Sequence, residues 1–169
     1  MPQRHRPEIH KSLVGKSLVG FEVGNVAYAV SINAVREIVN PLPLTPLPHV
    51  PAAVVGVGDH RGEVLPVIDL RLRFGLPRLP DPRRAKWILV NVEGRTVGLV
   101  VDRVTDVFGT GGTPLKAPPL LGEGDEARGI SGVTTHEGVL TFVLDLSRFA
   151  DLVLPLGSRP QLAPGEEQR

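Results

Sequence analysis

The sequence predicts a mostly β fold, built as one small barrel or a pair of them. Three observations lead to this fold class. Short segments rich in β-branched residues alternate with tight-turn signals, and no helical period extends over a convincing length. Several segments, such as ILVNV at 88–92, are apolar on nearly every residue. Such segments are typical of strands covered on both faces, as where two small barrels meet.

Three hairpins are predicted, each from two strand segments around a short turn. In chain order they are 18–23 and 26–32 around Gly24-Asn25, 87–92 and 95–101 around Glu93-Gly94, and 133–135 and 139–144 around His136-Glu137-Gly138. Glycine and asparagine tolerate the positive φ angles that tight hairpin turns require. Local turn chemistry therefore fixes where these strands begin and end.

The segments between the hairpins are less regular. Residues 63–70 form a strand candidate, in which Pro66 favours an edge position or a bulge because proline cannot donate to a ladder. Residues 33–40 are the best candidate for a short helical turn, with Asn33 as its cap and apolar side chains facing inward. The glycine- and proline-rich stretch 108–128 is predicted to be a surface loop.

The composition indicates one folded body with polar ends. Residues 1–16 are basic and 155–169 are rich in proline, glycine and charge, so both are predicted to be disordered around a body at 17–154. The chain has no cysteine, and no apolar run approaches the length of a membrane span. Residues 1–16 also lack the apolar stretch of a signal peptide. We therefore expect a cytoplasmic protein without direct membrane insertion.

Charge and aromatic content argue against nucleic-acid binding. The chain has 19 basic and 18 acidic residues, a net charge of +1, and only 4% aromatic residues. A nucleic-acid binder would usually carry a basic stripe, often with aromatic stacking platforms. A barrel that binds nucleic acid is kept only as a minor alternative.

An enzyme or metal protein is the main alternative to a binding module. The candidate side chains for metal binding or proton transfer are His49, Asp59, His60, Asp69 and His136. Their spacing matches no metal or nucleophile motif. Asp59 and His60 are neighbours, so in an extended chain their side chains would point to opposite faces. The sequence therefore predicts no catalytic residue, no metal and no cofactor.

Four stretches in register carry a resemblance to a known family. They are VREI at 35–38, the run from Leu47-Pro48 through Gly56-Val57 and Arg61-Gly62 to VLPVIDL at 64–70, GLVVDRVTDV at 98–107, and the closing Gly129-Ile130 with LTFVLDL at 140–146. Together they resemble the CheW-like domain family over about 17–153. The family's turn usually reads Asn-Leu-Arg-Gly, whereas this chain has Asp59-His60-Arg61-Gly62. That departure could alter the choice of receptor.

The resemblance implies a fold, a function and partners. The implied fold is two interlaced five-stranded barrels of SH3-like shape with a hydrophobic groove between them. The implied function is that of a non-catalytic adaptor between chemoreceptors and a CheA-type histidine kinase. Its partners would be the cytoplasmic tip of a chemoreceptor, the regulatory domain of the kinase and other CheW-like domains in rings. The protein would associate with receptor arrays at the inner membrane.

The same resemblance implies two sets of binding residues. The receptor-binding set is Val35, Glu37, Arg61, Gly62, Val104 and Val107. The kinase-binding set, taken from the neighbourhood of 44–55, is Pro48, Val54 and Gly56. From the residues alone, Arg61 could instead be a solvated turn residue, the valines could be core, and Glu37 could pair with Arg61 rather than with a partner.

Overall fold

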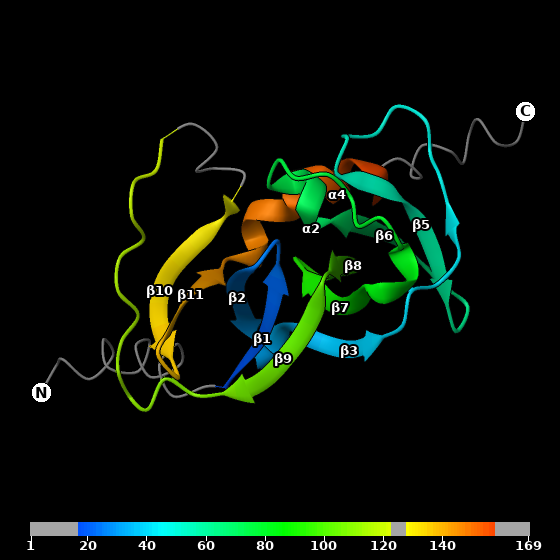
Figure 1. Cartoon of the computed structure of the whole chain (residues 1–169). Helices are drawn as coiled ribbons and strands as arrows, with labels where there is room; N and C mark the ends of the chain where they lie inside the picture. The colour runs from blue at the N-terminus through cyan, green and yellow to red at the C-terminus, as the bar shows by residue number, and fades with distance from the viewer. Residues whose placement is uncertain (1–16, 123–127, 158–169) are drawn as a thin grey trace, which may run out of the picture.

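The structure is a computed structural model, and it describes residues 17–122 and 128–157. Two β-sheets lie side by side in it, the first on the left and the second on the right of Figure 1. The first has the order β10-β11-β2-β1-β9, with β1 (Leu18–Val23), β2 (Val26–Ser31), β9 (Arg103–Phe108), β10 (Ile130–His136) and β11 (Val139–Leu144). The second has the order β3-β7-β8-β6-β5-β4, with β3 (Val35–Val39), β4 (Leu44–Thr45), β5 (Val54–His60), β6 (Glu63–Asp69), β7 (Lys86–Val92) and β8 (Arg95–Val101). The mostly β fold with two sheets is confirmed, and the two-residue β4 adds a sixth strand to the second sheet.

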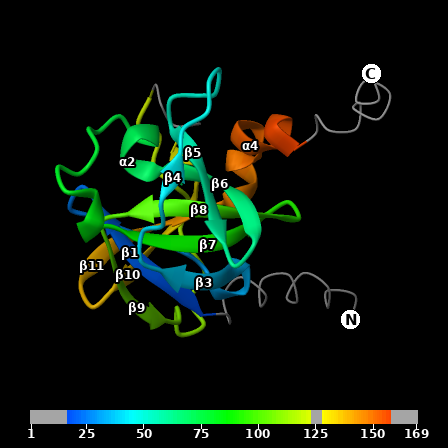
Figure 2. The same cartoon turned by 90° about the vertical axis from the view of Figure 1, so that its right-hand side faces the viewer.

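Short helical segments connect and cover the sheets. They are η2 (Ile32–Ala34), α2 (Leu70–Arg73), η3 (Pro82–Arg84), η4 (Leu146–Phe149) and α4 (Ala150–Gly157). Although η4 and α4 follow the last strand of the first sheet, α4 lies beside β5 and β6 of the second (Figure 2). The guanidinium of Arg95, at the start of β8, donates to the carbonyl of Val153 at 2.7 Å. The end of the described chain is therefore fixed against the second sheet.

The two sheets are interlaced by the path of the chain. The second sheet comes from one stretch, 35–101, whereas the first combines 18–31 with 103–144. Asp102 alone separates β8 of the second sheet from β9 of the first. Both sheets also contain one parallel pair, β11 with β2 and β6 with β8. The first sheet therefore cannot be completed until the chain has passed through the whole of the second.

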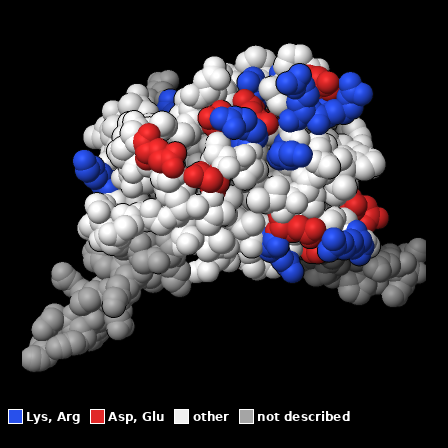
Figure 3. Space-filling view, turned by 60° about the horizontal axis from the view of Figure 1, so that its bottom comes forward, with Lys and Arg blue, Asp and Glu red and all other residues white. Residues whose placement is uncertain are grey.

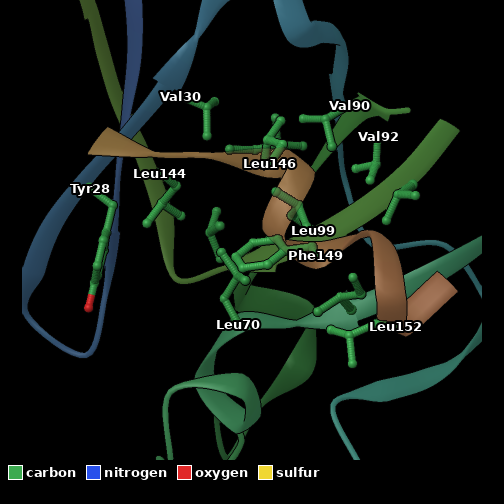
Figure 4. Packing of buried hydrophobic residues seen from close by; sticks show 14 of the residues in the cluster. Tyr28, Val30, Leu70, Val90, Val92, Leu99, Leu144, Leu146, Phe149 and Leu152 are labelled. Carbon is green, nitrogen blue, oxygen red and sulfur yellow. The ribbon is translucent and has the colours of Figure 1, made fainter. Parts of the chain in front are cut away.

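One large core joins the two sheets. Side chains from β2, β7, β8, α2, η4 and α4 converge on Phe149, which is fully buried (Figure 4). Burial of an aromatic side chain of this size is among the largest single contributions to stability. A smaller cluster inside the second sheet contains Leu65 and Trp87, and another inside the first contains Leu18 and Val143. The second sheet thus has its own apolar centre in addition to the shared core.

The predicted hairpins are present, with one boundary changed. The turns Gly24-Asn25, Glu93-Gly94 and Glu137-Gly138 all have two residues with positive φ, as in the type I′ turns that match strand twist. His136 belongs to β10 rather than to the turn, so the third turn has two residues instead of three. Residues 109–122, within the predicted loop 108–128, contain no helix or strand beyond an isolated bridge from Lys116 to Val133.

Two local predictions were wrong. Residues 35–39 form strand β3 and not a helical turn, because they pair with β7 from Val35 with Val90 to Val39 with Trp87. Only the three residues before them are helical. Pro66 lies in β6, an interior strand, and the bulge in the β5–β6 pair falls between Val54 and Gly56. The proline is tolerated because the ladder between β6 and β8 begins at the next residue, Val67.

The predicted domain ends can be compared only in part. The disorder expected for 1–16 and for 158–169 lies outside the described residues. Helix α4 runs to Gly157, past the boundary expected at residue 154. In the part of the chain that the structure describes, no helix has the length and apolar character needed to cross a membrane.

Candidate functional site

The tip of the β5–β6 hairpin presents Arg61 from a rigid turn. Arg61 and Gly62 have φ angles of 55° and 86°, so both are left-handed. The carboxylate of Asp59 accepts a hydrogen bond from the amide of Gly62 at 2.9 Å and closes the turn. The side chain of Arg61 is 74% exposed. The predicted turn residues therefore project an arginine from a fixed backbone, as a binding surface requires.

Glu37 on β3 joins this turn from the other side of the second sheet. Its carboxylate lies 3.0 Å from His60 Nε2 and 3.2 Å from Arg61 Nη2. β3 and β5 lie far apart in the strand order, so the sheet curls until its β3 edge meets the β5–β6 hairpin. The contact between Glu37 and His60 closes this barrel. We call Glu37, His60 and Arg61 the tip cluster.

The tip cluster also sets the charge state of its carboxylate. The hydrogen bond from His60 lowers the pKa of Glu37 below its ordinary value, against a smaller upward effect of desolvation, and Arg61 lowers it further. Glu37 therefore stays ionised at neutral pH. Sequence analysis raised the pairing of Glu37 with Arg61 as one possibility, but it missed the contact with His60. The unusual histidine of the turn motif was the available signal.

The apolar receptor candidates are divided between the sheets. Val35 lies on β3, and Val104 and Val107 lie on β9. Val35 and Val104 are half-buried and pack against the shared core, whereas Val107 is 55% exposed. Figure 3 looks from below onto the region of β9 and β3, where groups of charged residues surround a broad uncharged area. Of the three valines, only Val107 is mainly solvent-facing.

The kinase candidates are placed differently from what sequence analysis expected. Pro48 is exposed in the segment between β4 and β5. Val54 is 4% exposed and belongs to the shared core. Gly56 is buried with φ 142°, and a Cβ there would lie 2.4 Å from the carbonyl oxygen of Thr45. Val54 and Gly56 therefore cannot offer side-chain surface to a partner in this structure, because both serve internal packing.

A shallow hollow lies near these kinase candidates. Its volume is about 440 Å³, and its lining residues are Pro43, Thr45, Val57, Gly58, Asp59 and Val64. Val64 is 65% exposed, which is unusual for a valine within a strand. Sequence analysis did not select Val57 or Val64 as candidates. Apolar and polar residues do not alternate regularly in β5 and β6, so the sequence did not indicate which side chains would be exposed.

The residues considered for enzyme chemistry do not assemble. His60 contacts Glu37, Asp59 caps the turn, and Asp69, which is 3% exposed, pairs with Arg78 at 3.2 Å. His49 is exposed in the segment before β5. The members of the predicted enzyme set therefore have separate surroundings, which gives no support to a proton-transfer pair.

His136 has partners that sequence analysis did not foresee. Its Nε2 lies 2.9 Å from Asp106 on β9 and 3.9 Å from Glu137 in the adjoining turn. The three ligand atoms lie within 4.8 Å of one another, so these residues could hold a metal ion. The sequence places Asp106 30 residues from His136, and only the curl of the first sheet brings them together.

An ion pair fixes the crossing between the sheets. Arg71 on α2 donates to both carboxylate oxygens of Asp102, at 2.8 and 3.0 Å, and the amide of Gly24 donates to the same carboxylate at 2.8 Å. Burial raises the pKa of Asp102, but the hydrogen bonds from Arg71 and Gly24 outweigh that effect and leave the pKa below its ordinary value. Arg71 and Gly24 therefore hold the residue at which the chain changes sheets.

Comparison with known proteins gives a consistent result. The sequence model of the CheW-like domain matches residues 17–153. The chain is 35% identical over 150 residues to "Chemotaxis protein CheW" of Rhizobium meliloti (strain 1021), covering 89% of this chain and 94% of the relative. It is 30% identical over 155 residues to the protein of the same name from Treponema pallidum (strain Nichols), covering 85% and 91%.

A solved structure has the same fold. The crystal structure of the scaffolding protein TtCheW from Thermoanaerobacter tengcongensis matches with a TM-score of 0.70 at 27% identity. The match covers 77% of this chain and 88% of that chain. These similarities favour a non-catalytic scaffold and give no support to the enzyme alternative. The sequence match over the whole folded body, together with the shared fold, shows that this chain belongs to the CheW-like domain family.

Proposed function

We propose that this chain is a non-catalytic adaptor that couples chemoreceptors to a CheA-type histidine kinase in chemotaxis or a related chemosensory pathway. The observation that carries the proposal is the family match over residues 17–153, the entire double-sheet body. Relatives that the chain covers almost fully are named chemotaxis proteins, and the solved structure is that of a scaffolding protein. The adaptor acts in the cytoplasm, at receptor arrays on the inner membrane.

The proposed effect is thermodynamic. An adaptor that holds two partners at once makes the second contact intramolecular, with an effective concentration of about millimolar for short connections. Contacts of micromolar affinity then suffice for a stable assembly. The adaptor can also bias the kinase between two states, but only by the difference in its affinity for them.

The proposed receptor surface is centred on the tip cluster. Arg61 and Gly62 form its turn, Glu37 supports Arg61 at 3.2 Å, and Val35, Val104 and Val107 supply apolar contact area. An arginine is suited to this position because its planar fork makes several bonds while its stem packs on apolar groups. A helical receptor hairpin would lie along the valines and meet the arginine at its end.

The proposed kinase surface is the outer side of β4, β5 and β6. Pro48 and the lining of the 440 Å³ hollow, Val64 above all, are its exposed parts. Gly56 contributes indirectly, since its close approach to Thr45 keeps β4 beside β5. The kinase regulatory domain would cover this face, and other CheW-like domains would contact the remaining faces in rings.

Binding measurements with purified partners test the proposal. The intact chain should bind both a CheA regulatory domain and a receptor tip fragment in calorimetry, and binding to neither would overturn the adaptor function. Arg61→Ala should weaken receptor binding by about 2 kcal/mol, or roughly 30-fold. Arg83→Ala is the matched control, because Arg83 is 88% exposed and pairs only with nearby Asp81 in the described structure.

The pair formed by Glu37 and Arg61 allows a sharper version of the test. If the two residues act on the receptor as one unit, Glu37→Gln and Arg61→Ala should weaken binding non-additively in a double-mutant cycle. Kinase binding should remain unchanged in both variants. A folded Arg61→Ala protein with full receptor affinity would remove the tip cluster from the receptor surface.

A further inference from the structure

The first barrel is closed by a histidine contact that resembles the closure of the second. β9 and β10 are the two edges of the five-stranded sheet. His136 at the end of β10 meets Asp106 of β9 at 2.9 Å. Phe108 of β9 stacks on the imidazole, with ring centroids 3.7 Å apart and planes inclined by 8°. The imidazole is therefore held in one orientation between the two edges of the sheet.

The charges around the two closures differ. In the tip cluster, Glu37 is balanced by the guanidinium of Arg61. In the first barrel, His136 faces two carboxylates, Asp106 and Glu137, and no lysine or arginine of the described residues pairs with either. In the closure of the second barrel, the protein's own Arg61 therefore supplies the positive charge. The first closure has the anionic groups for a cation, but no lysine or arginine of the described part of the chain supplies it.

The separations of the ligand atoms suit a metal ion. Zinc and similar ions bind imidazole nitrogen and carboxylate oxygen at about 2.1 Å, so two ligand atoms on one ion lie about 3.0 Å apart at a right angle and at most about 4.2 Å apart. His136 Nε2 lies 2.9 Å from Asp106 and 3.9 Å from Glu137. The widest separation in the group is within 4.8 Å. A small rotation of Glu137, which is 79% exposed, brings all three into range.

A hollow beside these residues provides space for the remaining coordination positions. Its volume is about 300 Å³, and residues of β1, β2, β9, β10 and β11 line it. The small residues Gly20, Ala27 and Thr141 form part of its wall. Asp106, His136 and Glu137 also line it. Water ligands would fit there.

We propose that His136, Asp106 and Glu137 form a binding site for a divalent transition-metal ion, which bridges the edges of the first barrel. One imidazole and two carboxylates suit zinc, manganese, iron and nickel rather than the soft ions that need thiolates. The ion adds no catalytic step. It connects β9 to the β10–β11 hairpin and replaces a single hydrogen bond with three metal–ligand bonds.

Calorimetric titration of the full chain with zinc chloride tests the site. One zinc ion should bind per chain, and His136→Gln or Asp106→Asn should lower the affinity at least about tenfold. His49→Gln is the matched control, because His49 is exposed and lies before β5 in the second sheet. Asp106→Asn keeps the stacked imidazole in place, so it tests the site even if His136→Gln alters the fold.

The N-terminal segment supplies a second control. It contains His5, His10 and Glu8, which could bind zinc by themselves. Zinc binding should persist in the His5→Gln/His10→Gln double variant. The proposal is overturned if that variant loses the binding, if His136→Gln and Asp106→Asn both retain it, or if no stoichiometric binding occurs at zinc concentrations up to about 1 mM. A signal from one imidazole nitrogen in copper-substituted protein would support it.

Discussion

Removal of the charge at Asp102 should destabilise the protein far more than removal of a similar charge at its surface. Asp102 and Arg71 form a two-bond pair at 2.8 and 3.0 Å, and both side chains are only 19% exposed. Breaking a fully buried pair costs about 3–5 kcal/mol, whereas an exposed pair contributes about 0–1 kcal/mol. At this intermediate burial, Asp102→Asn should cost about 2 kcal/mol, because Arg71 loses its hydrogen-bonded carboxylate and keeps only the more distant charge of Asp69, while the Asn oxygen can still accept from Gly24.

Urea denaturation followed by circular dichroism measures this change in the free energy of unfolding, and thermal denaturation measures the accompanying change in Tm. A loss of about 2 kcal/mol corresponds to a fall in Tm of roughly 6 °C for a chain of this size. Glu22→Gln is the matched control, since Glu22 also makes two bonds to an arginine, Arg103, at 3.0 and 2.9 Å. Those side chains are 31% and 63% exposed, so the control should lose less than about 0.5 kcal/mol.

The pH dependence provides an independent check. The pKa of Asp102 is lowered in the folded state, so the stability it provides is fully present above its unfolded value of 3.8 and is lost as pH falls through the folded pKa. The difference between the wild type and Asp102→Asn should therefore be largest near neutral pH and narrow below pH 3.8. If Asp102→Asn is no less stable than Glu22→Gln at neutral pH, the ion pair between Asp102 and Arg71 does not stabilise the sheet crossing as inferred.

Two further predictions concern the second sheet. In carbon-detected NMR titration, the pKa of Glu37 should lie below its ordinary value of 4.5 and rise toward it in His60→Ala, because the hydrogen bond from His60 is the largest cause of the shift; an unchanged value would contradict the tip cluster. Gly56→Ala should destabilise by about 3 kcal/mol, because its φ is 142° and the added Cβ would lie 2.4 Å from the carbonyl oxygen of Thr45. Gly62→Ala, with φ 86° and no atom within 4 Å of the added Cβ, should cost only about 1 kcal/mol. Equal losses of stability in the two variants would exclude the close approach of β4 as the cause.

Local chemistry determined which parts of the fold could be predicted. The turn Glu93-Gly94 and its strands were recognisable because positive φ and β-branched flanks are properties of neighbouring residues. Residues 33–40 were predicted as a helical turn because their apolar spacing also fits a helix, yet 35–39 form a strand. Their strand conformation depends on pairing with β7, about 50 residues later in the chain, which no local pattern reveals.

The candidate site also combines features that local sequence predicts with features that depend on distant contacts. Arg61 and Gly62 stood out as a turn, and the family motif pointed to Glu37, but the contact of Glu37 with His60 depends on how the second sheet curls. Val54 was selected for the kinase surface because the family resemblance placed that surface in the neighbourhood of 44–55. Its burial depends on the core that β2, β8 and α4 build above it. Sequence position alone therefore could not distinguish surface from interior there.

The single-residue crossing at Asp102 has a consequence for how the molecule forms. β1 and β2 leave the ribosome before the other strands of the two sheets, yet their neighbours β9 and β11 end at residues 108 and 144. The early hairpin must wait, with its apolar faces uncovered, while the contiguous stretch 35–101 can pair with itself at once. Such distant pairings slow folding and lengthen exposure to aggregation. The interval before residue 144 emerges is therefore when a nascent chain of this type most needs the help of chaperones.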